Sequence, residues 1–171
     1  MTIVADFRES AFAPPRLDQC AKFVGRTAYW KLYAIENIFR VVVHTVLSAQ
    51  LGRGWWDLAV NPTIRSLAER RRQNYAQKPW YSSPGPHDIY YTLLAELNEI
   101  IRANSDLFRP VVPDVDQWIV GLESLRLPRN VVGHMNYPGR NDQKRIDVFY
   151  EDCKKLVAQI AASGLPLVIP R

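Results

Sequence analysis

The stretch from about Thr27 to Gln50 constrains the fold of this chain most strongly. Its large apolar residues recur every three to four positions, the spacing that places side chains on one face of an α-helix. Gly52 and Gly54 follow and end the pattern. A helix of this length must bury its apolar face against a broad partner surface, which we expect other helices to supply. The apolar set is Trp30, Ile35, Ile38, Val42 and Val46.

The rest of the chain alternates helical patterns with connections rich in proline and glycine. We predict a short helix near 17–24 after an irregular arm, a turn at 55–57, a loop at 78–86 and an extended tail at 163–171. No segment resembles a pair of strands, so the sequence predicts an all-α fold, a bundle of four to five helices. The expected parts are an N-terminal arm (1–25), one helical domain (26–162) and the tail. Longer helices are predicted at 62–77, 88–103, 114–134 and 142–162.

Charge and composition indicate a folded protein with an anionic partner. The 171 residues include 22 Lys and Arg against 17 Asp and Glu, and the net charge is +5. Basic domains commonly bind polyanions, so nucleic acid is the first expectation. The first ten residues lack the apolar core of a secretory leader, and charge or histidine interrupts the apolar stretches before the roughly 18 to 20 residues of a membrane span. We therefore expect a cytoplasmic protein without a membrane partner.

Several kinds of chemistry have no signature in the sequence. The three histidines lack the spacing to cysteine or carboxylate that a zinc site needs, and Cys20 and Cys153 form no Cys-x-x-Cys pair. There is no glycine-rich phosphate loop, no Gly-x-Ser-x-Gly elbow and no dinucleotide fingerprint. We expect no metal and no cofactor. The remaining candidates are reactions that histidine and arginine perform by themselves.

One segment has that character. Arg126, Asn130 and His134 are successive four-residue steps, so a continuing helix would align them on one face. Arg129 lies to one side of this line, within reach if the helix is distorted. Pro128 is expected to distort it, because proline lacks an amide donor and its ring clashes with the preceding turn.

The same residues have a simpler interpretation as a polar helix end. Asn130 and Gly133 would close the helix, and His134 would cover its last carbonyl groups. Two helix-weakening residues, Pro128 and Gly133, nevertheless flank the arginine, asparagine and histidine, which is unusual where packing is the only requirement. We favour the active site.

The string from Arg129 to His134 resembles the Arg-Asn-x-x-x-His form of the Arg-x(4–6)-His motif of HEPN domains. Residues 29–40 and 94–108 are also similar to bacterial HEPN proteins of defence and toxin type. The resemblance covers about residues 26–162. It implies a HEPN-like helical bundle, a metal-independent endoribonuclease that restricts phage or acts as a toxin, and a homodimer in which two motifs form one composite active site.

The chemistry of RNA cleavage fits these residue types. Attack by the RNA's own 2′-hydroxyl needs a base, an acid for the leaving 5′-oxygen and positive charge on the phosphoryl group. A histidine side chain, with an ordinary pKa near 6.5, can act as base or acid, and arginine presents a fork of donors to phosphate. Each chain supplies one motif histidine, so a two-fold dimer would bring a second.

Other residues receive supporting roles in this interpretation. Asn130 is expected to orient His134 or to bind backbone across the dimer, and Arg126, Glu36 and Arg40 are supporting candidates. Tyr137 lies three residues beyond His134, whereas the HEPN toxins that nucleotidylation silences carry their target tyrosine two residues beyond the histidine. This departure weighs against control by a paired nucleotidyltransferase.

A basic run with nearby aromatic residues is a second candidate site for RNA. Its cations could bind phosphates while its rings stack on unpaired bases, or the run could be a solvated helix face; we give both interpretations equal weight. The cations are Arg65, Arg70, Arg71, Arg72 and Lys78, and the rings are Tyr75, Trp80 and Tyr81.

Two alternative functions remain open. The first is a HEPN module that binds RNA or nucleotide without cutting it. The second is an interaction subunit of a defence or toxin–antitoxin complex, with an antitoxin or another complex member as its partner. His44 is expected in the core or an interface, and His87 in a helix cap. Trp55, Trp56 and Trp118 are assigned to the core or to a dimer interface.

Overall fold

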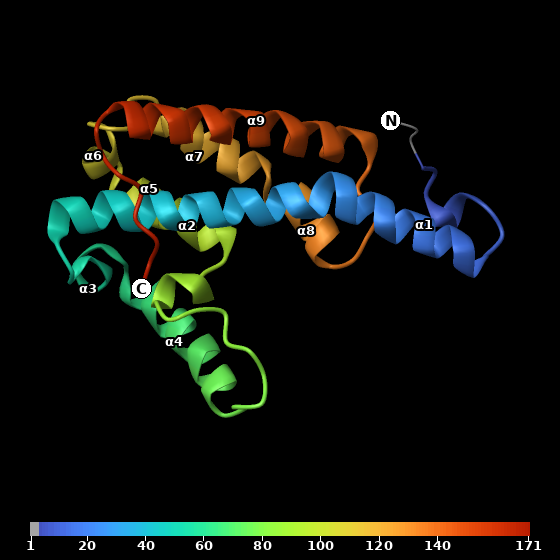
Figure 1. Ribbon diagram of the computed structural model, residues 1–171, viewed down its shortest axis with the longest axis horizontal. Helices are drawn as coiled ribbons and strands as arrows, with labels where there is room; N and C mark the ends of the chain where they lie inside the picture. The colour runs from blue at the N-terminus through green and yellow to red at the C-terminus, as the bar shows by residue number, and fades with distance from the viewer. Residues whose placement is uncertain (1–3) are drawn as a thin grey trace.

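The computed structural model describes residues 4–171, and this part of the chain is all-α, without a strand. Helix α2 (Trp30–Leu51) crosses the middle of the molecule, with α9 (Arg140–Ala162) lying along one side of it (Figure 1). Helices α5 (Leu94–Ala103), α6 (Ser105–Phe108) and α7 (Val115–Ser124) complete the bundle. Helix α4 (Pro62–Ala76) and the loop that follows it project from the opposite side of α2 (Figure 1).

The long central helix confirms the strongest prediction from the sequence. Ile35, Val42 and Val46 are fully buried, as expected from their spacing, and Ile38 is half-buried. Trp30 differs, because 42% of its surface is exposed and its indole N–H donates to the Arg26 carbonyl (2.9 Å). Cross-helix packing joins α2 to α7 and α9 through Phe39, Trp118 and Phe149, whose ring centroids lie 5.6–6.0 Å apart.

The helical start of the chain is longer than expected. Helix α1 (Pro14–Val24) begins at the two prolines that we assigned to an irregular arm. Proline suits the first positions of a helix, where its missing amide has no helical partner. A π-helical segment, Gly25–Tyr29, then joins α1 to α2, so the helix is continuous from Pro14 to Leu51.

The segment after α2 contains one confirmed cap and two corrections. Asn61 caps α4 by accepting a hydrogen bond from the Ile64 amide (2.9 Å), as predicted. The expected turn at 55–57 is a short helix, α3 (Trp55–Ala59). The predicted helix 88–103 is divided into a 3-10 helix (Asp88–Tyr91) and α5, because extended backbone at residues 92–93 separates them.

The predicted single helix from 114 to 134 is also two helices, α7 and α8 (Arg126–Gly133). The break at Leu125 follows from Pro128. In a continuous helix the amide of residue 128 would donate to the carbonyl of Ser124. Proline has no such amide, and its ring clashes with that carbonyl. Helix α7 therefore ends at Ser124, and Pro128 occupies the first turn of α8, where it is tolerated.

The core lies between α2, α5, α7 and α9, and both cysteines are buried free thiols. Trp55 and Trp56 belong to it, as expected, and Trp118 packs against it. The tail after α9 is extended and crosses α2. There the Val168 amide donates to the hydroxyl of the buried Thr45 (2.9 Å), and the Tyr90 hydroxyl donates to the Pro170 carbonyl (3.1 Å).

The run from Pro14 to Leu51 is long and apolar enough to cross a membrane by length and composition. Its most apolar window of 18 residues has a mean hydropathy of 1.2. The apolar stretch is therefore longer than we expected, since charge or histidine does not lower the hydropathy of this window below that of a possible span. In the folded chain 44% of that window is buried, and α2 contacts α5, α6 and α9. The core helix of a soluble protein and a signal sequence can both have this length and composition.

Candidate active site

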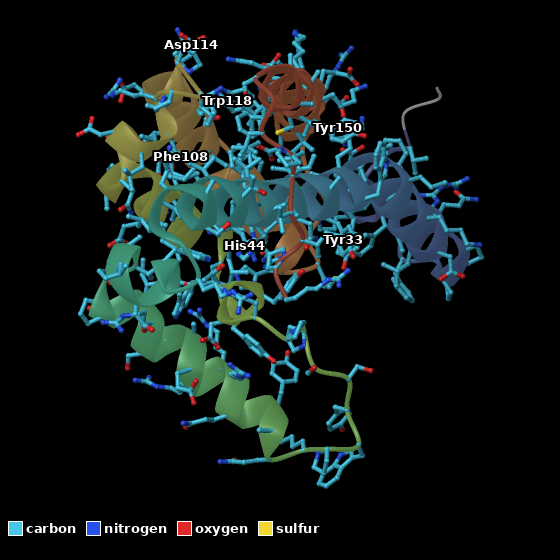
Figure 2. The ribbon with its side chains drawn as sticks, turned by 60° about the vertical axis from the view of Figure 1, so that its left-hand side comes forward. Tyr33, His44, Phe108, Asp114, Trp118 and Tyr150 are labelled. Carbon is cyan, nitrogen blue, oxygen red and sulfur yellow. The ribbon has the colours of Figure 1, made fainter. Side chains whose placement is uncertain are left out.

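The side of α2 and of the preceding π-helical segment that faces away from α7 and α9 is polar and aromatic. Tyr29, Tyr33, Glu36 and Arg40 recur at three- and four-residue spacing, so they line one side of the helix. Figure 2 shows Tyr33 on the side of α2 opposite Trp118 and Tyr150, which lie towards α7 and α9. This face is therefore directed away from the bundle, towards α8 and the loop after α4.

Glu36 joins the two arginines that the sequence assigned to the site. Its carboxylate lies 2.6 Å from Nη2 of Arg40 and 3.6 Å from Nη2 of Arg129, which comes from α8. Arg40 also donates to Asn37 Oδ1 (3.1 Å) and to the Thr92 carbonyl (3.0 Å). Two guanidinium groups share one carboxylate, so this cluster retains a positive charge.

Arg129 lies back over the last turn of its own helix. A Cβ atom at Gly133 would lie 3.5 Å from Nη1 of Arg129, an ordinary contact distance. The glycine therefore leaves the face of the guanidinium open on that side. The side chain of Arg129 is 29% exposed, enough to meet a ligand while Glu36 holds it in place.

Two adjoining hollows surround this cluster, with volumes of about 400 Å³ and about 600 Å³. They share four lining residues, and together we call them the tyrosine groove. The smaller hollow reaches Arg129 and Gly133, and the larger one reaches α4 and its loop. The shared residues are Glu36, Arg40, Pro84 and Tyr90; the smaller hollow adds Tyr29, Leu32, Tyr33, Asn37, Arg129, Val132 and Gly133, and the larger adds Arg71, Asn74, Tyr75, Lys78, Tyr81, Tyr91, Thr92 and Leu93.

The loop side of the groove is held in place by Gly85. A Cβ atom there would overlap the ring of Tyr90, so only glycine lets the loop approach this closely. The Gly85 carbonyl also accepts a hydrogen bond from the Tyr91 hydroxyl (3.1 Å). These contacts hold the loop predicted at 78–86 against the 3-10 helix that follows it.

His134 lies at the C-cap of α8 and is exposed. The next residue, Met135, has a φ of 61°, and its amide donates to the Val132 carbonyl (3.0 Å). The Asn136 amide donates to the Val131 carbonyl (2.9 Å). These bonds form the left-handed cap that commonly ends helices, here with methionine where glycine is usual. The helix therefore ends in this segment, as the helix-end interpretation expected, but Met135 and Asn136 close it and not Asn130 and Gly133.

The side chains of the motif do not share one hollow within the single chain. Asn130 and Arg126 line a third hollow of about 210 Å³ between α5 and α7, and Arg129 lies between it and the tyrosine groove. His134 lines neither of them. Arg126 and Asn130 thus share a hollow, whereas the exposed His134 side chain lies outside all three hollows. Asn130 contacts His134 through its backbone carbonyl, which accepts from the His134 amide (3.0 Å).

Two supporting candidates lie outside the groove. Arg126 pairs with Glu123 (2.9 Å) on the surface. Tyr137 faces the N-terminal arm, where its hydroxyl donates to the Val4 carbonyl and its ring stacks on Phe23 (6.1 Å between centroids). Burial raises the pKa of the Tyr137 hydroxyl. The structure thus separates Tyr137 from Arg129, whereas Glu36 and Arg40 contact or adjoin it.

The basic run is divided between ion pairs and the groove. Arg65 pairs with Asp57 (2.9 Å), Arg72 with Asp88 (2.6 Å), and Arg71 with Glu96 (2.7 Å). The hydrogen bonds that Arg71 donates to the Glu96 carboxylate raise the pKa of Arg71. Of the five cations predicted to bind RNA, Arg71 and Lys78 line the tyrosine groove, whereas Arg70 is exposed elsewhere on α4.

The other two histidines form a cluster with the tryptophans. Nδ1 of His44 accepts from the Trp55 indole (3.2 Å), and Nδ1 of His87 accepts from the Ile89 amide (3.1 Å), which confirms His87 as a cap. The ring centroids of the histidines lie 5.2 Å apart. Burial lowers the pKa of both, and His44 lowers that of His87 further. Figure 2 shows His44 on the lower side of α2.

Sequence reasoning singled out Tyr75 and Tyr81, which line the groove, but missed Tyr29, Tyr33, Tyr90 and Tyr91 as groove residues. A signal for Tyr29 and Tyr33 was present, since they continue the face of Glu36 and Arg40 at helical spacing. Nothing in the sequence indicated that the loop carrying Pro84 would lie against this face, because that contact depends on the tertiary fold.

Within residues 4–171 no group of three or more histidine, cysteine, aspartate or glutamate side chains is arranged to hold a metal ion. Comparison with known proteins adds no relative: no family model, no curated protein and no solved structure matches this chain.

Proposed function

We propose that this chain is a metal-independent endoribonuclease of the HEPN type. The observation that carries the proposal is the position of Arg129, which lies in a groove with a positive charge surplus, 3.6 Å from Glu36 and one helical turn before the exposed His134. Arginine in such a place can bind a phosphodiester. An exposed imidazole can take a proton from the 2′-hydroxyl of RNA or give one to the leaving 5′-oxygen. The resemblance of residues 129–134 to the HEPN motif supports the same assignment.

The proposed reaction needs only groups of protein and RNA. A histidine removes the proton of the 2′-hydroxyl, and this oxygen attacks the adjacent phosphorus while Arg129 stabilises the charge on the phosphoryl oxygens. The bond to the 5′-oxygen of the next nucleotide breaks, and a second histidine supplies the proton to that oxygen. The products are a 2′,3′-cyclic phosphate and a 5′-hydroxyl.

The second histidine would come from a second copy of the chain. Leu127, near the start of α8, and Met135, just after its end, have 63% and 84% of their surface exposed, which supports a protein contact along α8. A two-fold dimer about α8 would bring both copies of His134 and Arg129 to one cleft. Asn130, which lies in the third hollow, would serve to hold the α8 ends in register.

The proposed biological role follows from the danger of such an activity. A cytoplasmic ribonuclease damages its own cell unless it is restrained, so we propose a toxin or abortive-infection effector with an antitoxin or defence-complex partner. The likeness of the motif region to HEPN proteins of this type supports the role.

The test is cleavage of total tRNA and of a mixed-sequence RNA in EDTA by the wild-type protein and by His134→Ala, with the product ends mapped. We expect cleavage in EDTA that leaves cyclic phosphate ends and that His134→Ala abolishes. Arg109→Ala, which breaks exposed pairs with Asp106 and Asp116 and lies outside the hollows, serves as the control for the loss of a surface positive charge. Cleavage of equal rate by His134→Ala would refute the assignment.

One observation favours a second candidate, an RNA-binding module that does not cut. His134 lies outside the hollow that contains Arg129, so a single chain holds the groove without the proton-transfer group. This alternative predicts RNA binding that is unchanged in His134→Ala and no cleavage by the folded dimer.

A further inference from the structure

The tyrosine groove extends well beyond the motif, and its far end has the character of a ligand site. It runs from Arg129 on α8, past Arg40 on α2, to Lys78 and Tyr81 in the loop after α4. Three segments far apart in the sequence thus build one continuous surface. We propose that this groove binds an unpaired strand of RNA, with bases stacked on Tyr33 and Tyr81 and the phosphates along its cations; the inference rests on the proposed function and names the form of its substrate.

Four of the six tyrosines that line the groove are exposed in a way that packing does not explain. Tyr33 is 66% exposed and Tyr81 63%, and Tyr29 and Tyr75 expose 52% and 42%. Within residues 4–171 no other aromatic ring stacks on Tyr33, while Tyr81 has only the exposed Trp80 beside it, at 6.2 Å. Open rings on both walls of a groove provide faces on which bases can stack.

The charge of the groove suits a polyanion. Arg40, Arg71, Arg129 and Lys78 line it, and the carboxylates of Glu36 and Glu96 offset two of these four charges. Because Arg40 and Arg129 share Glu36, and Lys78 forms no ion pair within residues 4–171, the surplus lies at both ends of the groove. A strand that crosses the groove would meet a cation at each end and aromatic rings between them.

The arrangement favours an unpaired strand over a duplex. Bases in a duplex are stacked on one another and cannot reach a side-chain ring, whereas unpaired bases can turn out and stack on tyrosine. Hollows of about 400 Å³ and 600 Å³ have the size of sites for small ligands and can hold individual nucleotides. The groove therefore discriminates by strand form, and it delivers the strand to Arg129 at its end.

The experiment measures binding in the His134→Ala background, so that cleavage does not interfere. A fluorescently labelled 12-nucleotide RNA of mixed sequence and the same RNA as a blunt duplex are titrated with protein, and anisotropy gives the Kd. We expect the single strand to bind at least tenfold more tightly than the duplex. Tyr33→Ala and Tyr81→Ala should each weaken binding of the single strand by about fivefold or more, the range measured for lost base stacking.

Matched variants separate stacking from folding and from hydroxyl chemistry. Tyr33→Phe and Tyr81→Phe keep the ring and should leave the Kd within about twofold. Phe12→Ala removes an aromatic side chain that is 71% exposed and lies outside the groove, and it should change nothing. Thermal unfolding of each variant checks that the fold is intact. Lys78→Ala should also make the negative slope of log K against log salt concentration shallower by about 0.7, because one phosphate contact with a single strand contributes about that much to the slope.

The outcomes distinguish this inference from the proposed reaction. Selective binding of single strands that depends on the two rings supports the inference even if the wild-type protein never cleaves RNA, in which case only the ribonuclease proposal fails. Equal binding of duplex and single strand, or alanine variants that bind as well as the wild type, would overturn the inference whatever the cleavage assay shows.

Discussion

The carboxylate of Glu36 and the guanidinium of Arg129 lie 3.6 Å apart, and this ion pair joins α2 to α8 at the end of the tyrosine groove. The other carboxylate oxygen of Glu36 lies 2.6 Å from Arg40. One acidic residue therefore sets both the position of Arg129 and the amount of positive charge that the groove presents. Its side chain is only 15% exposed, so solvent screens these contacts weakly.

Glu36→Gln should separate these two effects. Loss of the carboxylate leaves two arginines without a counter-charge, so the free energy of unfolding should fall by about 1 to 3 kcal/mol. The affinity for single-stranded RNA should rise several-fold, because the groove gains one net positive charge. Urea unfolding and anisotropy measure the two quantities. Glu123→Gln breaks the exposed pair with Arg126 and should cost less than about 0.5 kcal/mol. An unchanged stability for Glu36→Gln would contradict the structural role.

A composite site makes a quantitative prediction for mixed dimers. If each cleft needs His134 from both chains, only dimers of two wild-type chains cut RNA. After wild-type and His134→Ala chains are co-refolded in equal amounts, the activity should fall to about a quarter of that of the wild-type dimer at the same total concentration. The initial rate of tRNA cleavage measures this value. A fall to one half would mean that each chain works with its own histidine.

The stability of the fold should decline in mild acid because of His44 and His87. Burial lowers the pKa of both below the ordinary value near 6.5, so between these values the unfolded chain binds more protons than the folded one. Their contribution to stability is complete above about pH 6.5 and is lost as the pH falls through the folded pKa. The loss is at most about 1.4 kcal/mol per pH unit for each histidine. Urea midpoints at pH 7.5, 6.5 and 5.5 test it.

A control for this pH dependence is available at the helix cap. His87→Asn keeps an acceptor for the Ile89 amide but cannot titrate in this range. The stability of this variant should depend less steeply on pH than that of the wild type. If the slopes are identical, the acid sensitivity does not come from His87.

Met135 adopts a left-handed conformation that costs a residue with a side chain about 1 kcal/mol. Met135→Gly should therefore raise the free energy of unfolding by about that amount, because glycine takes this conformation without strain. The reverse substitution, Gly164→Ala at the end of α9, is the control. The φ of Gly164 is 83°, so alanine there should destabilise the protein by a similar amount. Thermal denaturation of both variants measures the pair. A loss of stability in Met135→Gly would show that the methionine side chain makes packing contacts that outweigh the strain.

The sequence predicted those helices whose signals are local. Helix α2 has a long apolar stripe, α4 has Asn61 and Pro62 at its start, and α9 ends before Gly164, so propensity and capping were sufficient. The failures came where one residue outweighed a pattern. Pro128 was recognised as a distortion, but its clash with the carbonyl four residues earlier divides the helix and does not merely bend it.

The candidate site was predicted in its residue types but not in its arrangement. Glu36, Arg40 and Arg129 form one cluster, as the motif suggested, whereas His134 and Tyr137 lie outside it. His134 keeps the helical hydrogen bond to the Asn130 carbonyl, but its exposed side chain lines none of the hollows that the arginines line, which counting along a helix could not show. The groove itself depends on the loop docking at Gly85, which no local pattern encodes.

The π-helical segment Gly25–Tyr29 sets the rotational phase between α1 and α2. A π-turn holds one more residue than an α-turn, which rotates everything before it by about 100° about the helix axis. In this phase Cys20 and Phe23 face the segment after α8, where Phe23 stacks on Tyr137. Deleting a single residue from this segment would restore α-helical geometry and rotate α1 by about 100°, which would turn Phe23 away from Tyr137. The N-terminal arm would then lose its contact with Tyr137 beside the motif. This single π-turn thus determines which face of α1 packs against the segment after α8.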